Sequence, residues 1–356
     1  GISAVLASRV LVGLGEGTAP PAASLLVAQW VGVEERSRAV SALGVGKIMG
    51  NVFGLLLAPV LIEQIGGWEP VFYVFGGVGV VWAVGWLAFG QNGPSAAQPP
   101  AAVAIRRNDN ESMQFGEKSE DVESSLLADF QAVPWQRIMT YTPMWAIIVT
   151  HFCQDFGFYA LLSYLPTYLS SAWSFSIKQS GFYLVAPYLL MAAGGSASGV
   201  VADKLYEGGM ALTSVRKLMQ GVAFFGPALM LGFLAADDLL GLGVQLNGLI
   251  ALMIISLALA FSAAAYAGLY CSHQDISVKY SGILLGISNT VGALSGTLST
   301  YLVGKVLEDR PGDWSSALFG PASFFYLVGL GSWLVFFDAR SEDFDRAESS
   351  SSSSTD

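Results

Sequence analysis

Charged residues are scarce in this sequence. They make up 12% of its 356 residues, whereas hydrophobic residues make up 53%, and the mean hydropathy is +0.54. A soluble domain of this length needs far more charge to cover its surface. A bilayer instead requires about 20 apolar residues per helical crossing, and the apolar residues here are clustered in long blocks. The sequence therefore predicts an all-α, multi-pass membrane protein with the lipid bilayer as its solvent.

Cysteine and histidine are also scarce. Cys153 and Cys271 both lie in apolar blocks, which excludes a disulfide framework or a CxxC metal site and favours simple packing roles. The two histidines, His151 and His273, are too few for a histidine-rich metal centre. We therefore expect no metal and no cofactor.

Catalytic signatures are missing from the sequence. It contains no GxSxG, HExxH or P-loop pattern. The glycines of GLGEGT lie inside a predicted helix and not after a strand, so they do not indicate a nucleotide-binding loop. We expect neither an enzyme nor a nucleic-acid partner, and a membrane-embedded enzyme stays a disfavoured alternative.

Long apolar blocks define the domain organisation. They predict nine spans, at residues 2–31, 39–65, 71–89, 144–168, 180–201, 218–235, 249–270, 281–306 and 319–337. A stretch rich in Pro, Ser and acidic residues predicts a disordered cytoplasmic linker at 91–142, and a serine run predicts a disordered tail at 341–356. Two helical units remain, at 1–90 and 143–340.

The basic residues orient these spans. If the linker is cytoplasmic and successive spans alternate, eight basic residues outside the linker fall on the cytoplasmic side and three on the opposite side. The eight are Arg36, Arg38, Lys204, Arg216, Lys217, Lys279, Arg340 and Arg346, and the three are Lys178, Lys305 and Arg310. The positive-inside rule supports this orientation.

Three spans, a long linker and six spans match part of a six-plus-six transporter. On this interpretation, 143–340 is a complete six-helix C-terminal bundle, and 1–90 holds the last three helices of the N-terminal bundle. The sequence starts at Gly1 inside an apolar helix, so we expect a fragment with about nine of twelve helices, the first three missing.

Glycines recur at four-residue spacing in two spans, at Gly46, Gly50 and Gly54 and at the pairs Gly282/Gly286 and Gly292/Gly296. Small residues four apart lie on one helix face and let neighbouring backbones approach closely. Two interpretations stay open: an interface on which the bundles rock, or static helix packing.

The first span contains two ionisable residues, Arg9 and Glu16, which is costly by about 2.5–3.5 kcal/mol each at the centre of a bilayer. They are seven residues apart, so they share a helix face and are separated by roughly 10 Å. Arginine offers a planar fork for carboxylate or phosphate oxygens, and a buried glutamate can carry a proton. Either both line an aqueous cavity, or each pairs with another helix to hold the fold.

The fourth span carries Asp155, with Gln154 beside it, Tyr159 one turn later and His151 one turn earlier. An acid and an imidazole at this spacing could pass protons or bind a cation, although His151 could instead lie near the interface. Lys47 in the second span lies near the cytoplasmic side, and its long side chain can reach water, so we interpret it as structural.

The seventh span ends in LYCSHQDISVKYSG, which places His273 and Asp275 at its cytoplasmic end. The pair could form a gate or an ion-coupling site. It could equally be a solvated helix terminus.

Several blocks together resemble a known family. They are RVLVGLGEGTAPPAASLLVAQWVGVEERSRA, GWEPVFYVFGGVGVVW, WAIIVTHFCQDFGFYALLSYLPTYL, GGSASGVVADKL with VRK downstream, and SHQDISVKYSGILLGISNTVGALSG. In this order they resemble the major facilitator superfamily and, within it, the anion:cation symporter family of sodium/phosphate cotransporters, vesicular glutamate transporters, sialin and plant plastid anion transporters. The resemblance covers nearly the whole chain except the linker and the tail.

This resemblance assigns roles to several residues. It implies that Arg9 and Glu16 act in anion binding and coupling. Gln154 stands where relatives often carry arginine or histidine, which puts glutamate-type specificity in doubt. Asp155 stands where asparagine or serine is usual and adds negative charge near the cavity.

The same resemblance extends to the second half of the chain. It implies that Asp203 caps and gates against neighbouring helices. His273 and Asp275 match a motif whose HQD form looks like the plant and algal members, which favours a plastid envelope over a plasma or vesicular membrane. Asn289 lies in the same block and is expected in the substrate site.

We therefore predict secondary active transport of a small organic or inorganic anion, phosphate or carboxylate, coupled to protons or sodium and working by alternating access. The alternative is a transporter-like anion receptor that does not transport. The expected substrate-binding residues are Arg9, Gln154, Tyr159 and Asn289; the ion-coupling residues are Glu16, Asp155, His273 and Asp275; and the gating residue is Asp203.

Limited proteolysis of the membrane-embedded protein should cut first between residues 90 and 142. This stretch lacks apolar periodicity and carries Pro and Ser clusters, and exposed polar segments of that kind are preferred cleavage sites. Mass spectrometry of the first fragments measures the position. A first cut inside a predicted span would contradict the topology.

Overall fold

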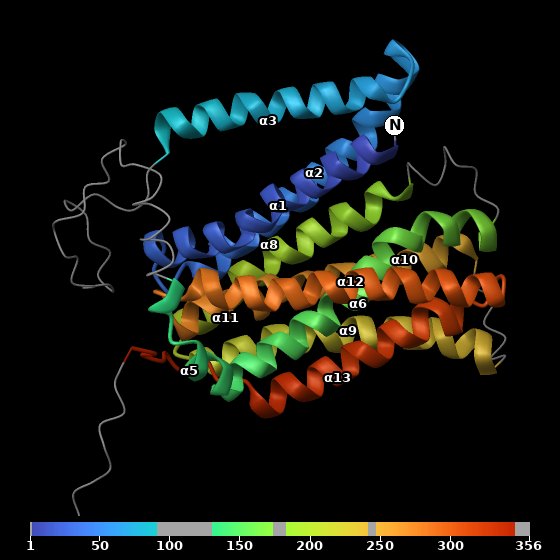
Figure 1. The fold of residues 1–356 in the computed structure, drawn as a ribbon. Coiled ribbons are helices and arrows are strands. Elements are labelled where there is room, and N and C mark those ends of the chain that lie inside the picture. Colours follow the sequence, from blue (N-terminus) through green and yellow to red (C-terminus); the bar gives the residue numbers. More distant parts are fainter. Residues whose placement is uncertain (1, 91–129, 174–182, 241–246, 346–356) are drawn as a thin grey trace, which may run out of the picture.

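The computed structural model describes residues 2–90, 130–173, 183–240 and 247–345, and every regular element in these ranges is helical (Figure 1). The long helices are α1 (Ile2–Trp30), α2 (Arg36–Ile65), α3 (Glu69–Phe89), α6 (Thr142–Trp173), α8 (Val185–Glu207), α9 (Leu212–Leu240), α10 (Gly248–Ser262), α12 (Ser281–Asp309) and α13 (Gly320–Phe336). The short ones are α5 (Trp135–Thr140), the 3₁₀ turn η1 (Ala263–Tyr266), α11 (Leu269–Ile276) and the π-helical turn η2 (Ser315–Phe319). The predicted all-α fold is confirmed.

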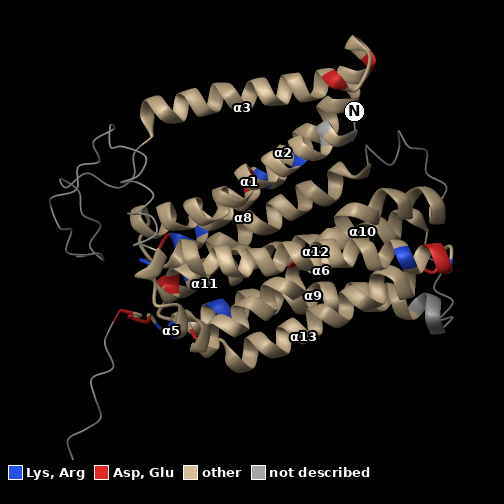
Figure 2. Cartoon of the chain, viewed as in Figure 1, with Lys and Arg blue, Asp and Glu red and all other residues tan. Residues whose placement is uncertain are grey.

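Eight helical segments in the described ranges are long and apolar enough to cross a membrane. The predicted span 281–306 falls in α12, which has 29 residues and is not among these eight. Its serines bond to neighbouring carbonyls, as when the Ser295 hydroxyl donates to the Phe152 carbonyl of α6 at 2.8 Å. Figure 2 shows most charged residues gathered at the two ends of the helices, as a bilayer requires.

Two groups of helices meet along two lines. The helices α6, α12, α13, α9, α10 and α8 pack into one bundle around a shared apolar core. From the other group, α2 lies along α8, and the second half of α1 lies on α12. In Figure 1, α3 stands apart at one edge, and none of its residues is buried. The end where α3 finishes and α5 and α6 begin is called the linker end below.

The α2–α8 contact depends on glycines of α8. A Cβ atom at Gly199 would lie 2.8 Å from the Ser41 hydroxyl and 2.9 Å from the Ser37 carbonyl. Such an approach is possible only without a side chain. The series Gly46, Gly50 and Gly54, expected to form an interface, has no neighbour within 4 Å of an added Cβ among the described residues. Among the described residues α2 turns a different face towards α8, so an interface at this series stays a prediction.

The predicted span 249–270 is broken in the structure. α10 ends at Ser262, and the chain passes through η1 before α11 resumes. Gly268 lies so close to α9 that a Cβ would be 2.8 Å from the Gln220 backbone nitrogen. The freed Leu269 amide donates to Gln220 Oε1 at 3.0 Å, which satisfies a buried polar group that the break exposes.

Parts of the predicted disordered linker and tail are folded. Within 130–142, α5 buries Ile138 completely. In the tail, Phe344 is buried, and Arg137 donates to its carbonyl at 2.7 Å. Lys279 bonds Asp345 at 2.6 Å and holds the pKa of that carboxyl below its usual range. The apolar Ile138 and Phe344 explain the difference, and residues 91–129 and 346–356 lie outside the described ranges.

Replacing Gly199 by valine should destabilise the protein. The valine would collide with the Ser41 side chain and the Ser37 carbonyl, and overpacking costs about 1–3 kcal/mol. Gly221→Val is the matched control, since a Cβ at Gly221 meets nothing within 4 Å. Thermal unfolding in detergent measures both. Equal midpoints for the two variants would show that the α2–α8 approach is not tight.

Candidate functional site: a cavity between the two groups of helices

A cavity of about 350 Å³ lies between the two groups of helices. Four predicted site residues line it, namely Gln154, Asp155, Tyr159 and Asn289. The first three come from α6, and Asn289 comes from α12. The opposite wall is formed by α1 and α2.

Lys47 and Asp155 are the charged side chains among the residues that line this cavity. Asp155 is 7% exposed, and no arginine or lysine forms an ion pair with it in the described chain. The Gln154 side-chain amide donates to Ser262 at 2.7 Å, while its carbonyl oxygen has no hydrogen-bond partner among the described residues. The cavity therefore combines one cation, one carboxyl group and a free amide oxygen.

Lys47, which was interpreted as structural, also lines the cavity. It lies on the cavity face of α2 together with Val40, Leu43 and Asn51. These residues follow one another at intervals of three or four, which is the spacing of a single helix face. That spacing could have identified Lys47 from the sequence.

Aromatic side chains form much of the wall. Phe158 and Tyr159 come from α6, Tyr266 from η1 and Tyr270 from α11. Tyr270 also interacts with the Asp155 carboxyl group. Sequence reasoning missed Tyr266 and Tyr270, because they reach the cavity only through the break between α10 and α11.

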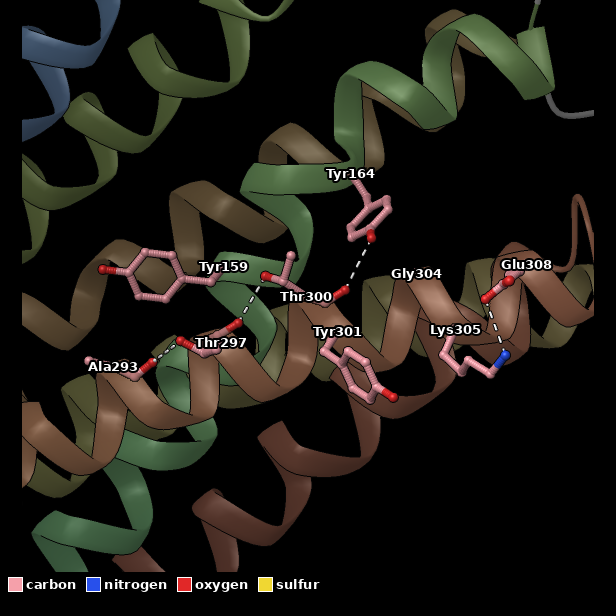
Figure 3. A pocket seen from close by; sticks show the side chains of 10 residues that line it. Tyr159, Tyr164, Ala293, Thr297, Thr300, Tyr301, Gly304, Lys305 and Glu308 are labelled. Atoms are coloured by element: carbon pink, nitrogen blue, oxygen red, sulfur yellow. Dashed lines mark hydrogen bonds and ion pairs between the residues drawn. The ribbon is translucent and has the colours of Figure 1, made fainter. Parts of the chain in front are cut away.

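A groove of about 830 Å³ continues from the cavity along α12 (Figure 3). Tyr159 lines both spaces, and Tyr164 donates to the Thr300 carbonyl at 3.1 Å. Lys305 and Glu308 pair at 3.1 Å at the other end of the groove, where α12 finishes. The groove thus leads away from the linker end.

At the linker end, buried salt bridges join the two groups of helices. Arg36 of α2 donates to Asp275 Oδ1 at 2.7 Å, and Arg216 of α9 donates to Asp275 Oδ2 at 2.6 Å. Arg216 also donates to the Ser37 hydroxyl at 2.7 Å. These side chains are all at most 4% exposed.

Asp203 of α8 forms a second link. It accepts hydrogen bonds from the first-turn backbone amides of Ser37 and Arg38 at 3.1 and 3.0 Å, and from Arg38 Nε at 2.9 Å. A carboxylate at a helix N-terminus satisfies free amides and complements the helix dipole. The residues Arg36, Ser37, Arg38, Asp203, Arg216 and Asp275 are called the interbundle network below.

Two predicted site residues are not among those that line the cavity. Arg9 is exposed, and its guanidinium lies 5.8 Å from the ring centre of Phe72 on α3. Glu16 is exposed on the same half of α1, and its charge acts on Tyr159 of the cavity wall. The expectation that they line the cavity with Gln154 differs from the structure, because α1 reaches the cavity only from Ala19 onwards.

His273 and Asp275 do not line the cavity either. Both oxygens of Asp275 are engaged by arginines, so neither is free for a coupling ion. His273 is buried and does not line the cavity, and its Nε2 lies 2.8 Å from the Ser288 hydroxyl. Asp275 belongs to the interbundle network, and His273 lies behind the cavity wall.

Two groups of membrane helices around a cavity, closed at one end by salt bridges, define a membrane protein of the transporter class. The chain belongs to the Major Facilitator Superfamily, which matches residues 1–300. The family is one of transporters and not of enzymes, in agreement with the lack of a catalytic signature.

Three relatives illustrate the similarity. The chain is 38% identical over 352 residues to probable anion transporter 5, chloroplastic, of Oryza sativa subsp. japonica, with 97% of the chain and 73% of the relative aligned. It is 36% identical over 343 residues to sodium-dependent phosphate transport protein 1, chloroplastic, of Arabidopsis thaliana, with 94% and 61% aligned. It is 34% identical over 337 residues to the ascorbate transporter, chloroplastic, of the same plant, with 94% and 58% aligned.

These relatives confirm the resemblance to the anion:cation symporter family. They are also longer than this chain, which spans 73% of the rice protein and 61% and 58% of the two Arabidopsis proteins.

Removing the Asp203 carboxylate should open the linker end and expose Cys271. The Cys271 thiol is buried and lies 3.9 Å from the Arg36 carbonyl, so it reports on this contact. Hydrogen bonds to a charged group contribute about 1.5–3 kcal/mol, so Asp203→Ala should speed alkylation of Cys271 by about tenfold or more.

A Cys153→Ala background leaves Cys271 as the remaining cysteine of the 356 residues. Glu35→Ala is the control, because Glu35 pairs with the same Arg38 at 3.4 Å but lies exposed on the same group of helices. Maleimide labelling followed by mass spectrometry gives the rates. An unchanged rate in Asp203→Ala would mean that Asp203 does not hold the two groups together.

Proposed function

We propose that the protein is a secondary active transporter of a small anion, coupled to protons or sodium, that works by alternating access. The observation that carries this proposal is a cavity between the two groups of helices. Salt bridges close the cavity at the linker end, and a groove leads from it towards the other end. A small-molecule site at the interface of two helical repeats is the usual arrangement in secondary transporters.

The charges in the cavity explain why transport of an anion would need a coupling ion. Lys47 attracts an anion, whereas an ionised Asp155 repels it. A proton or a sodium ion on Asp155 removes this repulsion, so anion and cation bind favourably only together. Gln154, Tyr159 and Asn289 would then orient the anion through hydrogen bonds.

The interbundle network would act as the gate at the linker end. Asp203 and Asp275 hold the first turn of α2 against α8, α9 and α11. Breaking these contacts while the groove closes would expose the cavity to the linker side. We propose 1–90 and 143–340 as the two moving units.

The relatives support a choice of substrate class and of membrane. Their names specify phosphate, ascorbate or an anion, and all carry the word chloroplastic. Phosphate and ascorbate are therefore the first candidates, and the plastid envelope is the proposed location.

Reconstituted transport tests the proposal. In liposomes holding the full-length native protein, an inward proton or sodium gradient should drive accumulation of radiolabelled phosphate or ascorbate above equilibrium. An anion receptor predicts binding without accumulation. Binding that saturates with no gradient-dependent uptake would therefore overturn transport in favour of the receptor.

Substitutions at Lys47 and Arg9 separate two possible anion sites. If Lys47 holds the anion, Lys47→Gln should weaken affinity by about tenfold, or ~1.4 kcal/mol, a typical value for a contact with a charged group. If Arg9 holds it, Arg9→Ala should abolish binding and Arg9→Lys should weaken it, because lysine lacks the planar fork. Affinity is measured on folded, detergent-purified variants. Normal affinity in Arg9→Ala would remove Arg9 from the site.

A further inference from the structure

A chain of polar side chains lies behind the cavity wall. The Ser288 hydroxyl of α12 is 3.0 Å from His151 Nδ1 of α6 and 2.8 Å from His273 Nε2 of α11. All three residues are completely buried. The other ring nitrogen of His151 lies 3.7 Å from Asp155 Oδ2, which is slightly beyond hydrogen-bonding distance. Asp155 itself lines the cavity.

The outer nitrogen of His151, Nε2, has no hydrogen-bond partner among the described residues. His273 interacts with the backbone of Tyr270. Leaving a buried polar atom unpaired costs about 1–3 kcal/mol, and such groups are uncommon in folded proteins. Two buried imidazoles held in line by one hydroxyl, one of them with an unpaired nitrogen near Asp155, are therefore poorly explained by packing alone.

A glycine of α12 leaves room for the side chains of this polar row. A Cβ at Gly292 would lie 2.5 Å from Asp155 Oδ2 and 2.9 Å from His151 Cδ2. Only a glycine lets the carboxyl group and the imidazole lie together against the α12 backbone. Ser288 is four residues before Gly292, so the hydroxyl and the gap lie on the same helix face.

Charged and titratable groups lie at both ends of this row of side chains. On the cavity side, Lys47 of α2 and Tyr270 of α11 act on Asp155. Lys47 also acts on His151. On the far side, Asp275 acts on His273 from two residues along α11. Asp275 is the carboxylate that binds Arg36 of α2 and Arg216 of α9.

From this geometry we infer that Asp155, His151, Ser288 and His273 form a proton relay that connects the cavity to the interbundle network. The inference rests on the proposed transport function and specifies the proton as its coupling ion. Hydroxyl and imidazole groups suit this role, because each can accept one proton while it donates another.

The transfer balances one proton at each step. Asp155 gives its proton to His151 Nε2, after a small movement closes the 3.7 Å gap. His151 Nδ1 releases a proton to Ser288, and the Ser288 hydroxyl proton passes to His273 Nε2. Asp155 ends as a carboxylate, His151 and Ser288 end neutral, and His273 ends as an imidazolium.

The new charge on His273 would act on the gate. A cation near Asp275 competes with Arg36 and Arg216 for the same carboxylate and repels both arginines. Loading a proton in the cavity thereby weakens the salt bridges that close the linker end. Proton binding in the cavity would thus be coupled to opening at the linker end through the side chains of Asp155, His151, Ser288 and His273.

Proton arrival at each histidine tests the relay directly. The full-length protein is labelled with ¹⁵N-histidine in lipid bilayers, and the signals of His151 and His273 are assigned from His151→Gln and His273→Gln samples. Magnetic resonance then follows the response of each imidazole after a drop in pH. In the native protein both should respond together.

Two variants cut the relay at different points. Ser288→Ala should leave the His151 response intact and slow that of His273 by about 100-fold or more, the usual effect of losing a positioned proton-transfer group. Asp155→Asn should slow both responses. Ser288→Thr, which keeps a hydroxyl at this position, should retain the native His273 response. Ser299→Ala, which removes another buried hydroxyl of α12, is the control and should change neither.

A His273 response in Ser288→Ala as fast as in the native protein would overturn the relay. So would a His151 signal that shifts with sodium and not with pH, since it would make Asp155 a sodium site.

Transport is measured separately: Ser288→Ala should lose proton-driven phosphate accumulation but keep phosphate–phosphate exchange. If the native protein accumulates no phosphate or ascorbate, the transport proposal fails, while the histidine responses still decide the relay.

Discussion

The buried carboxylate of Asp275 is held between Arg36 and Arg216, and the rest of the arrangement depends on this contact. One arginine comes from each group of helices, so a single acid fixes their positions at the linker end. Removing one partner of a buried ion pair leaves an uncompensated charge, at a cost of about 3–5 kcal/mol. The same contact that closes the cavity is therefore sensitive to any further charge placed beside it.

The bilayer explains why the functional groups cluster as they do. A polar group in hydrocarbon must find a partner within the protein, and the buried Ser288 and Ser295 of α12 find theirs on α6. Gly292 and Gly296 bring the α12 backbone against Asp155 and Tyr159. The break before α11 adds Tyr270 to the same wall. The cavity wall is therefore built by three features together: the close approach of α12 to α6, the break before α11 and the buried polar side chains.

The sequence predicted some of this site correctly and some of it not. Gln154, Asp155 and Tyr159 were singled out as polar residues in an apolar span, and all three line the cavity. Arg9 was singled out by the same reasoning and does not, because unusual polarity shows that a residue needs a partner but not which one. Lys47 was missed, because a lysine near the end of a span can reach either water or a cavity.

Composition and apolar block length alone determined the class of protein, the helical fold and the approximate spans, because a bilayer allows few alternatives for a chain so poor in charge. The order of the sequence motifs indicated the family. Only the tertiary structure decided that Asp275 is a salt-bridge residue and that His151 and His273 share Ser288. These contacts join residues 137 and 15 positions apart, and the periodicity of a single helix contains no information about which face of another helix it will meet.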